Sequence, residues 1–181
     1  MITKYKLFEN RKETIVRHVE DGDFDAVKSF IDNGGDINKN YGIYEPIYLI
    51  IEAVYNEHYD IAKLLIYNGA DVNVSDSDRT ALHYAIDNSD YDMVKLLIDN
   101  GADIKKNTDD GDSPLLLTDS NWKLIKLLIE KGANPHVIDE FGYHFLDLSS
   151  DRNKIHSLVK EYFPKVFNDY LKLKKIKDFN L

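Results

Sequence analysis

The 181-residue sequence predicts an all-α solenoid built from helix–turn–helix repeats. A related polar string follows an apolar run four times: NGGDIN (33–38), NGADVN (68–73), NGADIK (100–105) and KGANPH (131–136). Separations of 35, 32 and 31 residues divide the aligned glycines, Gly34, Gly69, Gly101 and Gly132. A period of about 20–50 residues is typical of repeats that bury their apolar faces by stacking on one another.

Residues 75–104 show the repeat most completely. Polar turn formers occupy 76–78, and Thr80 can cap a first helix through its hydroxyl group. The string DNSD at 87–90 should end that short helix. Apolar residues at helical spacing over 93–98 predict a second helix, in which we expect Leu96 to be buried. Gly101 should end this helix because glycine adopts the left-handed conformation at little cost.

These motifs resemble the ankyrin repeat family. Thr80, Ala81, Leu82 and His83 match its T-P-L-H motif, with alanine in place of proline. Three segments match its second helix and reversal: AKLLIYNGADVN (62–73), VKLLIDNGAD (94–103) and IKLLIEKGANP (125–135). The resemblance covers roughly residues 13–160. It implies an ankyrin-like fold with short β-turn or hairpin tips, and a partner-binding surface formed by the tips and the exposed sides of the first helices.

The chain length favours one repeat domain, which we expect at 13–162. The expected repeats are 13–38, 39–74, 75–105, 106–136 and 137–162, and the first and last resemble caps. The first helix of repeat two should be longer than the family norm, whereas repeat four is shortened near Trp122. A basic segment at 1–12 precedes the domain. A basic C-terminal helix at 163–181 should pack on the last repeat through an apolar stripe: Val166, Phe167, Tyr170 and Leu173.

Composition limits the classes of partner. With 32 acidic and 23 basic residues the formal charge is −9, and an acidic chain repels the phosphate backbone, so we expect no nucleic-acid partner. There is no cysteine, and no apolar stretch has the length of a signal peptide core or a membrane span. We therefore expect a cytoplasmic protein, monomeric when free, that binds no membrane.

No motif for catalysis or metal binding stands out. The six histidines are not at compact ligand spacing, and there is no phosphate-binding glycine loop or nucleophile elbow. The string DDGDS at 109–113 is too short for a twelve-residue calcium loop. We expect no enzyme activity, no cofactor and no metal. His83 should bond to the backbone of a neighbouring repeat.

The resemblance places the candidate partner-binding residues on the tips and on the exposed first-helix positions. They are Tyr41, Tyr44, Asp76, Ser77, Arg79, Asp87, Asn88, Asp109, Asp110, Asp112, Glu140, Phe141 and Tyr143. Aromatic residues beside charges are typical of interface anchors. We expect Tyr41, Tyr44 and Tyr143 at the surface and, by contrast, Tyr48, Tyr55 and Tyr59 in the core.

The function expected is non-enzymatic binding of another protein, a basic one, at an acidic and aromatic concave face. One setting is an immunity-type inhibitor of a basic toxin. The alternative is a secreted or viral effector that binds a host protein, located then in the host cytosol. A remote alternative is an enzyme or metal protein built on an ankyrin scaffold.

Overall fold

The computed structural model describes residues 14–43 and 45–179. The chain forms two compact units, Met1–Asp103 and Ile104–Leu181, called here the N-terminal unit and the C-terminal unit. Within the described residues, β pairing is limited to isolated bridges between helices, which confirms the all-α fold class. None of the described helices is long and apolar enough to cross a membrane. The basic segment expected at 1–12 lies outside the described residues.

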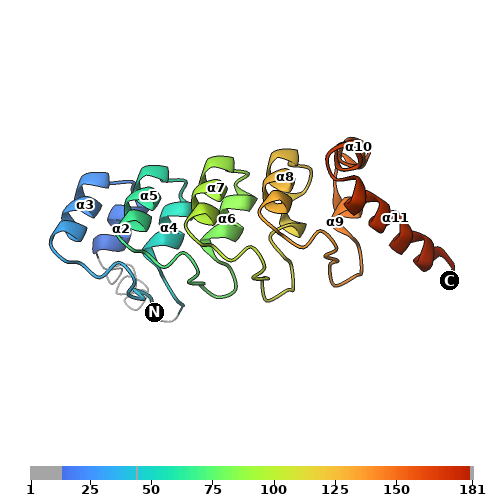
Figure 1. The fold of residues 1–181 in the computed structure, drawn as a ribbon. Helices are drawn as coiled ribbons and strands as arrows, with labels where there is room; N and C mark the ends of the chain where they lie inside the picture. Colours follow the sequence, from blue (N-terminus) through green and yellow to red (C-terminus); the bar gives the residue numbers. More distant parts are fainter. Residues whose placement is uncertain (1–13, 44, 180–181) are drawn as a thin grey trace. The chain divides into compact units, whose positions relative to one another are not determined.

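In its described residues, the N-terminal unit holds three helix pairs, one for each of repeats one to three. They are α2 (Thr14–Glu20) with α3 (Phe24–Asp32), α4 (Leu49–Tyr55) with α5 (Tyr59–Tyr67), and α6 (Ala81–Asp87) with α7 (Tyr91–Asp99). The first helices α2, α4 and α6 lie side by side as one layer, and the second helices form another (Figure 1). Leu49, Leu65, Leu82 and Leu97 are fully buried between the layers, so stacking supplies the core that no single pair has.

The second helices begin and end by the same local devices. A polar N-cap side chain accepts an N–H of the first turn in four of the five described second helices: Asp23 from Ala26 (3.0 Å), Asp90 from Met93 (3.0 Å), Asn121 from Leu124 (3.3 Å) and Asp151 from Lys154 (3.4 Å). Just past the end of the second helix in each of repeats one to four lies one of the four aligned glycines, with φ between +78° and +95°. A Cβ at these glycines would meet nothing within 4 Å, so the backbone angle and not space demands glycine. The predicted glycine stop is confirmed.

The last asparagine of the recurring string links successive repeats. Asn38 donates from Nδ2 to the Gly69 carbonyl (2.9 Å) and accepts the Asp71 N–H at Oδ1 (2.8 Å). Asn73 makes the same pair of bonds to Gly101 (3.0 Å) and Asp103 (2.8 Å). The side-chain amide suits this place because it both donates and accepts. Lys105 takes this position in the next string, and a lysine side chain cannot supply the acceptor half.

The C-terminal unit departs from the regular pair. In repeat four the first helix is reduced to the 3₁₀ turn η1 (Leu116–Thr118), followed by α8 (Trp122–Glu130). Repeat five has α9 (Phe145–Leu148) and α10 (Arg152–Tyr162), and α11 (Pro164–Phe179) follows it. The shortened repeat four was expected from the sequence. Trp122 there packs against the rings of Tyr162 (5.4 Å between centroids) and Phe163 (6.1 Å).

Polar and aromatic contacts join the helix α11 to the last repeat. Tyr170 is buried, and its hydroxyl donates to Asp147 Oδ1 (2.8 Å), which also receives Lys174 Nζ (2.8 Å). Val166 and Phe167 are half-buried. The expected stripe is wrong at Leu173, which is 47% exposed, because the face of α11 that meets α9 carries Tyr170 and Lys174.

Two further expectations for the helices are wrong. The first helix of repeat two is not elongated, because α4 has seven residues, as α6 has. The extra residues form the loop before it, where Asn40 Oδ1 accepts the N–H of Gly42 and of Ile47 (both 2.9 Å). Leu96 is only half-buried, since the inward face of α7 is set by Met93, Val94 and Leu97.

Candidate functional site

The tips are the turns that precede the first helices: residues 75–80 in the N-terminal unit, and 108–113 and 138–144 in the C-terminal unit. Each is closed by a side chain at its start. Asp76 Oδ1 accepts the N–H of Arg79 (3.1 Å), and Thr108 Oγ1 that of Asp112 (3.2 Å). Asp139 Oδ1 accepts two, from Phe141 (3.0 Å) and Tyr143 (2.7 Å). These bonds hold the tip backbone in a defined conformation.

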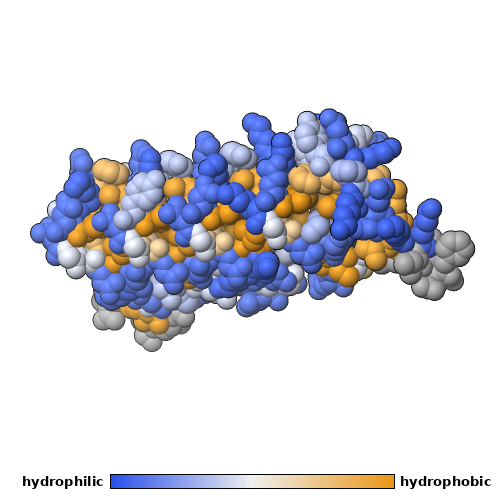
Figure 2. All heavy atoms as spheres, in the orientation of Figure 1, coloured by the Kyte–Doolittle hydropathy of each residue, from blue (hydrophilic) through white to orange (hydrophobic). Residues whose placement is uncertain are grey.

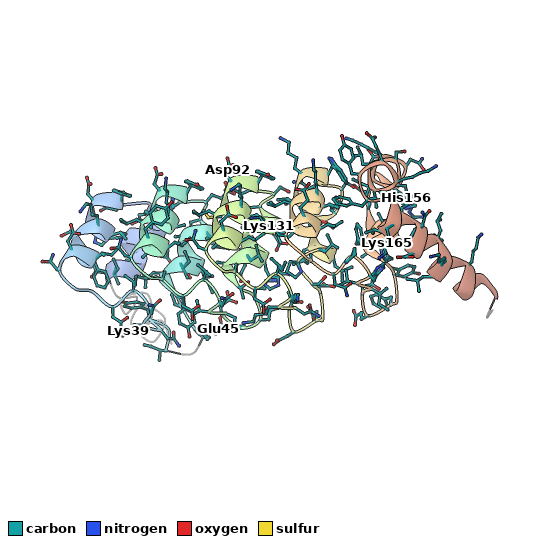
Figure 3. All side chains as sticks on the ribbon, in the orientation of Figure 1. Lys39, Glu45, Asp92, Lys131, His156 and Lys165 are labelled. Carbon is teal, nitrogen blue, oxygen red and sulfur yellow. The ribbon has the colours of Figure 1, made fainter. Side chains whose placement is uncertain are left out.

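The acidic candidates differ in how their carboxylates are used. Asp109, Asp110 and Glu140 are exposed, whereas Asp112 is half-buried. Asp76 is half-buried, and its Oδ2 accepts the hydroxyl of Tyr84 (2.6 Å) while Oδ1 closes the tip, so it positions its neighbours. Figure 2 shows mostly hydrophilic residues over the tips of the N-terminal unit. In Figure 3, Lys39 and Glu45 lie on this tip side, while Asp92 lies at the opposite edge beside α7.

The tip at 138–144 presents three large apolar side chains to solvent. Phe141 is 76% exposed, and Tyr143 and Ile138 are each 54% exposed. The surface position expected for Tyr143 is therefore confirmed. Sequence reasoning missed Ile138, although its place two residues before Glu140 on the same tip could have indicated it. An exposed cluster of large apolar side chains is a candidate interaction surface.

A further exposed aromatic residue, Tyr55, lies on a first helix of the N-terminal unit. Tyr55 ends α4 and is 61% exposed, so the expectation that it is a core residue is wrong. Its ring and that of Tyr84 on α6 form a T-shaped pair, with centroids 5.5 Å apart. Tyr55 takes the same place in its helix as Asp87 takes in α6, and aligning the two repeats could have indicated its exposure. Asp87 is exposed and forms an ion pair with Arg79.

Contacts around Tyr84 hold the tip at 75–80 against helix α6. The hydroxyl of Tyr84 is held by Asp76, and burial, followed by that hydrogen bond and the negative charge of Asp76, raises the pKa of Tyr84. The phenol therefore stays protonated and keeps donating to the carboxylate throughout the physiological pH range. The tip at 75–80 and helix α6 are joined by this bond and by the Arg79–Asp87 pair.

The other tyrosines give mixed results. The surface position expected for Tyr41 is wrong: it is 8% exposed, because its hydroxyl donates to the Asp36 carbonyl (2.6 Å) and Lys39 lies over its ring (4.9 Å). Tyr44 lies outside the described residues. Tyr48 and Tyr59 are half-buried. Of the remaining candidates, Ser77 and Asn88 are exposed and Arg79 is half-buried.

The candidate residues therefore form separate local groups. In the N-terminal unit the structure brings together Asp76, Arg79 and Asp87, with Tyr55 and Tyr84 added. In the C-terminal unit Asp109, Asp110 and Asp112 share one tip, and Glu140, Phe141 and Tyr143 share another.

Four of the histidines contact the backbone through a ring nitrogen: His58, His83, His144 and His156. His83 is fully buried, and its Nδ1 accepts the N–H of Thr80 in its own repeat (3.0 Å). His58 bonds to the adjacent repeat, since its Nε2 lies 2.9 Å from the Glu20 carbonyl. His144 caps α9, accepting the Leu146 N–H at Nδ1 (3.2 Å), and burial lowers the pKa of His144 to about 4. Among residues 14–43 and 45–179, no three histidine or carboxylate side chains gather as metal ligands.

Comparison with known proteins agrees with the repeat geometry. A family model described as ankyrin repeats, three copies, matches residues 15–108, just over half of the chain. No curated protein matches the sequence. The matched segment contains the three helix pairs of the N-terminal unit with their glycine stops and the Thr80–His83 motif. The chain belongs to the ankyrin repeat family.

Proposed function

We propose that this ankyrin repeat protein is a non-enzymatic module that binds a basic partner protein through its acidic and aromatic tips. Ankyrin repeats mediate binding to other proteins and typically serve as scaffolds without catalysis. The observation that carries the proposal is the tip at 138–144, where a rigid turn exposes Ile138, Phe141 and Tyr143. Aromatic side chains held in place are the usual anchors of protein interfaces.

Charge supports the basic character of the partner. The exposed tips carry Asp109, Asp110 and Glu140, and the whole chain has a formal charge of −9. Complementary charge speeds the encounter of two proteins and disfavours partners of like charge. A basic toxin blocked by an immunity-type inhibitor is the setting that we propose first. A host protein bound by a secreted or viral effector is the alternative, and the identity of the partner separates the two.

The test is affinity capture on the purified protein from a lysate of the cells that make it, and from a host lysate, with mass spectrometry of what is retained. A variant with Asp109, Asp110 and Asp112 all changed to lysine is the matched control, since these tip residues contribute little to the core. We expect a basic protein on the wild type that is depleted on the variant. Equal capture by both would contradict the proposed surface, and capture of acidic proteins alone would contradict the proposed partner.

A further inference from the structure

The C-terminal ends of the three first helices in the N-terminal unit are held next to one another. His58 Nε2 lies 2.9 Å from the Glu20 carbonyl at the end of α2, and Asn88 Nδ2 donates to the Val54 carbonyl near the end of α4 (3.4 Å). Figure 1 shows α2, α4 and α6 side by side. Packed helices lie about 8–10 Å apart, so the end of α4 is close to the ends of both α2 and α6, whereas α2 and α6 lie about twice as far from each other.

The residues that end these helices form a row of acid, aromatic and acid. Glu20, Tyr55 and Asp87 are the last residues of α2, α4 and α6, respectively. Equivalent positions of stacked helices face the same way. The two helices beside α4 therefore each end in a residue with a carboxylate, Glu20 on one side of Tyr55 and Asp87 on the other. Tyr55 is 61% exposed and Asp87 is exposed.

The ring of Tyr55 is held in place without being covered. This ring and that of Tyr84 form a T-shaped pair, with ring planes at 84° and centroids 5.5 Å apart. Tyr84 is itself fixed by the bond from its hydroxyl to Asp76 (2.6 Å). A fixed, exposed tyrosine face attracts a cation through the negative charge density above the ring. Carboxylates on both sides add to that attraction.

We infer that Tyr55 is the binding site for an arginine side chain of the partner, whose guanidinium group stacks on the ring and donates to one of the two flanking carboxylates, Glu20 or Asp87. Arginine fits better than lysine because its planar group can stack on an aromatic face and donate to carboxylates at the same time. Asp87 already forms an ion pair with Arg79. A carboxylate has about four lone-pair sites, so Asp87 can accept a second guanidinium. This inference rests on the proposed function and names the chemistry of the bound side chain.

The test uses a tetra-arginine peptide at low salt, followed by nuclear magnetic resonance of the full chain. The matched neutral probe is tetra-citrulline, which keeps the shape of arginine without its charge, and tetra-lysine tests charge without the planar group. We expect tetra-arginine to shift the ring resonances of Tyr55 and the amide of Glu20 or of Asp87. Tetra-citrulline should shift none of them, and tetra-lysine should bind more weakly than tetra-arginine.

Variants then assign the contact. Tyr55→Leu should weaken tetra-arginine binding by roughly two- to fivefold, the equivalent of an exposed cation–π contact. Tyr55→Phe keeps the ring and should bind like the wild type. The matched control is Tyr67→Leu on α5, because Tyr67 is similarly exposed (66%) but lies on a second helix. It should leave binding unchanged.

The contrary outcomes separate this inference from the proposed function. Shifts confined to 109–112 and 139–143 would overturn the binding site at Tyr55 and leave the tips as the binding surface. Equal binding by the Tyr55→Leu and Tyr67→Leu variants would also overturn this binding site. No shift at any residue would count against both the binding site at Tyr55 and a cation-binding surface on the tips. If Tyr55→Leu fails to fold, the wild-type titration with the three peptides still decides.

Discussion

At the scale of single residues, the turn between paired helices passes through the left-handed region in repeats one to three. Repeat one has Gly22 there (φ +73°), but repeat two has Glu57 (φ +60°) and repeat three has Ser89 (φ +55°). A residue with a side chain pays about 1–2 kcal/mol in this conformation, and glycine does not. A Cβ at Gly22 would also lie 2.8 Å from His58 Cε1, so that site admits only glycine. At position 57, by contrast, glycine would relieve the strain of the left-handed backbone angle that Glu57 now adopts.

We expect Glu57→Gly to raise the free energy of unfolding by about 1 kcal/mol. Glu57 is exposed, so its side chain contributes little packing to lose. Thermal or denaturant unfolding measures the change. Ser77→Gly is the control, because Ser77 is an exposed turn residue with an ordinary φ and should be neutral or slightly destabilised. A Glu57→Gly variant less stable than the wild type would show that the left-handed angle is not strained.

His144 gives a prediction about pH. The pKa of His144 falls from 6.5 to about 4, mainly through burial and in spite of the Pro135 carbonyl. Between these pH values the unfolded chain binds a proton that the native ring does not. Stability should therefore fall as the pH drops from 6.5 to 4, by roughly 3 kcal/mol in all.

The variant His144→Asn isolates this effect. Asparagine can still accept the Leu146 N–H as an N-cap, but it does not titrate in this range. Between pH 6.5 and 4, we expect the denaturant concentration at the unfolding midpoint to change less with pH in this variant than in the wild type. Some slope should remain, since burial also lowers the pKa of His156. An unchanged slope would show that His144 does not carry the pH dependence.

At the scale of elements, the register of α7 decides which leucine supports the stack. Leu97 is fully buried, whereas its neighbour Leu96 is half-buried. Leu97→Ala should cost about 2–5 kcal/mol of stability, because it leaves a cavity between the helix layers. Leu96→Ala is the matched control and should cost clearly less. Chemical denaturation of both variants measures the difference, and a larger loss for Leu96→Ala would place the core on the other face of α7.

At the scale of the whole molecule, acids and aromatics should affect different rate constants for the partner. Changing Asp109, Asp110 and Asp112 to lysine should slow association, most clearly at low salt, because exposed charge acts through long-range attraction. Tyr143→Ala should instead speed dissociation, by the equivalent of about 2 kcal/mol if its ring is central to the contact.

Binding kinetics at two salt concentrations, with the partner identified by capture, separate the two effects. Both sets of residues lie on tips, so the melting temperature should stay close to that of the wild type. Wild-type kinetics in both variants would move the binding surface elsewhere, for example to α11 or to the second helices.

The sequence by itself determined the repeats and their local signals. The glycine stops, the polar N-caps and the shortening of repeat four all depend on residues within one repeat, so a one-dimensional pattern suffices to predict them. The exposure of Asp109, Glu140, Phe141 and Tyr143 followed from their place on turns. The tertiary structure decided everything that depends on packing between elements. It buried Tyr41 against the Asp36 carbonyl, left Tyr55 exposed at the end of α4, and chose Leu97 over Leu96. Adjacent apolar residues on a helix differ by about 100° in direction, and only the position of the neighbouring helices determines which one faces the core.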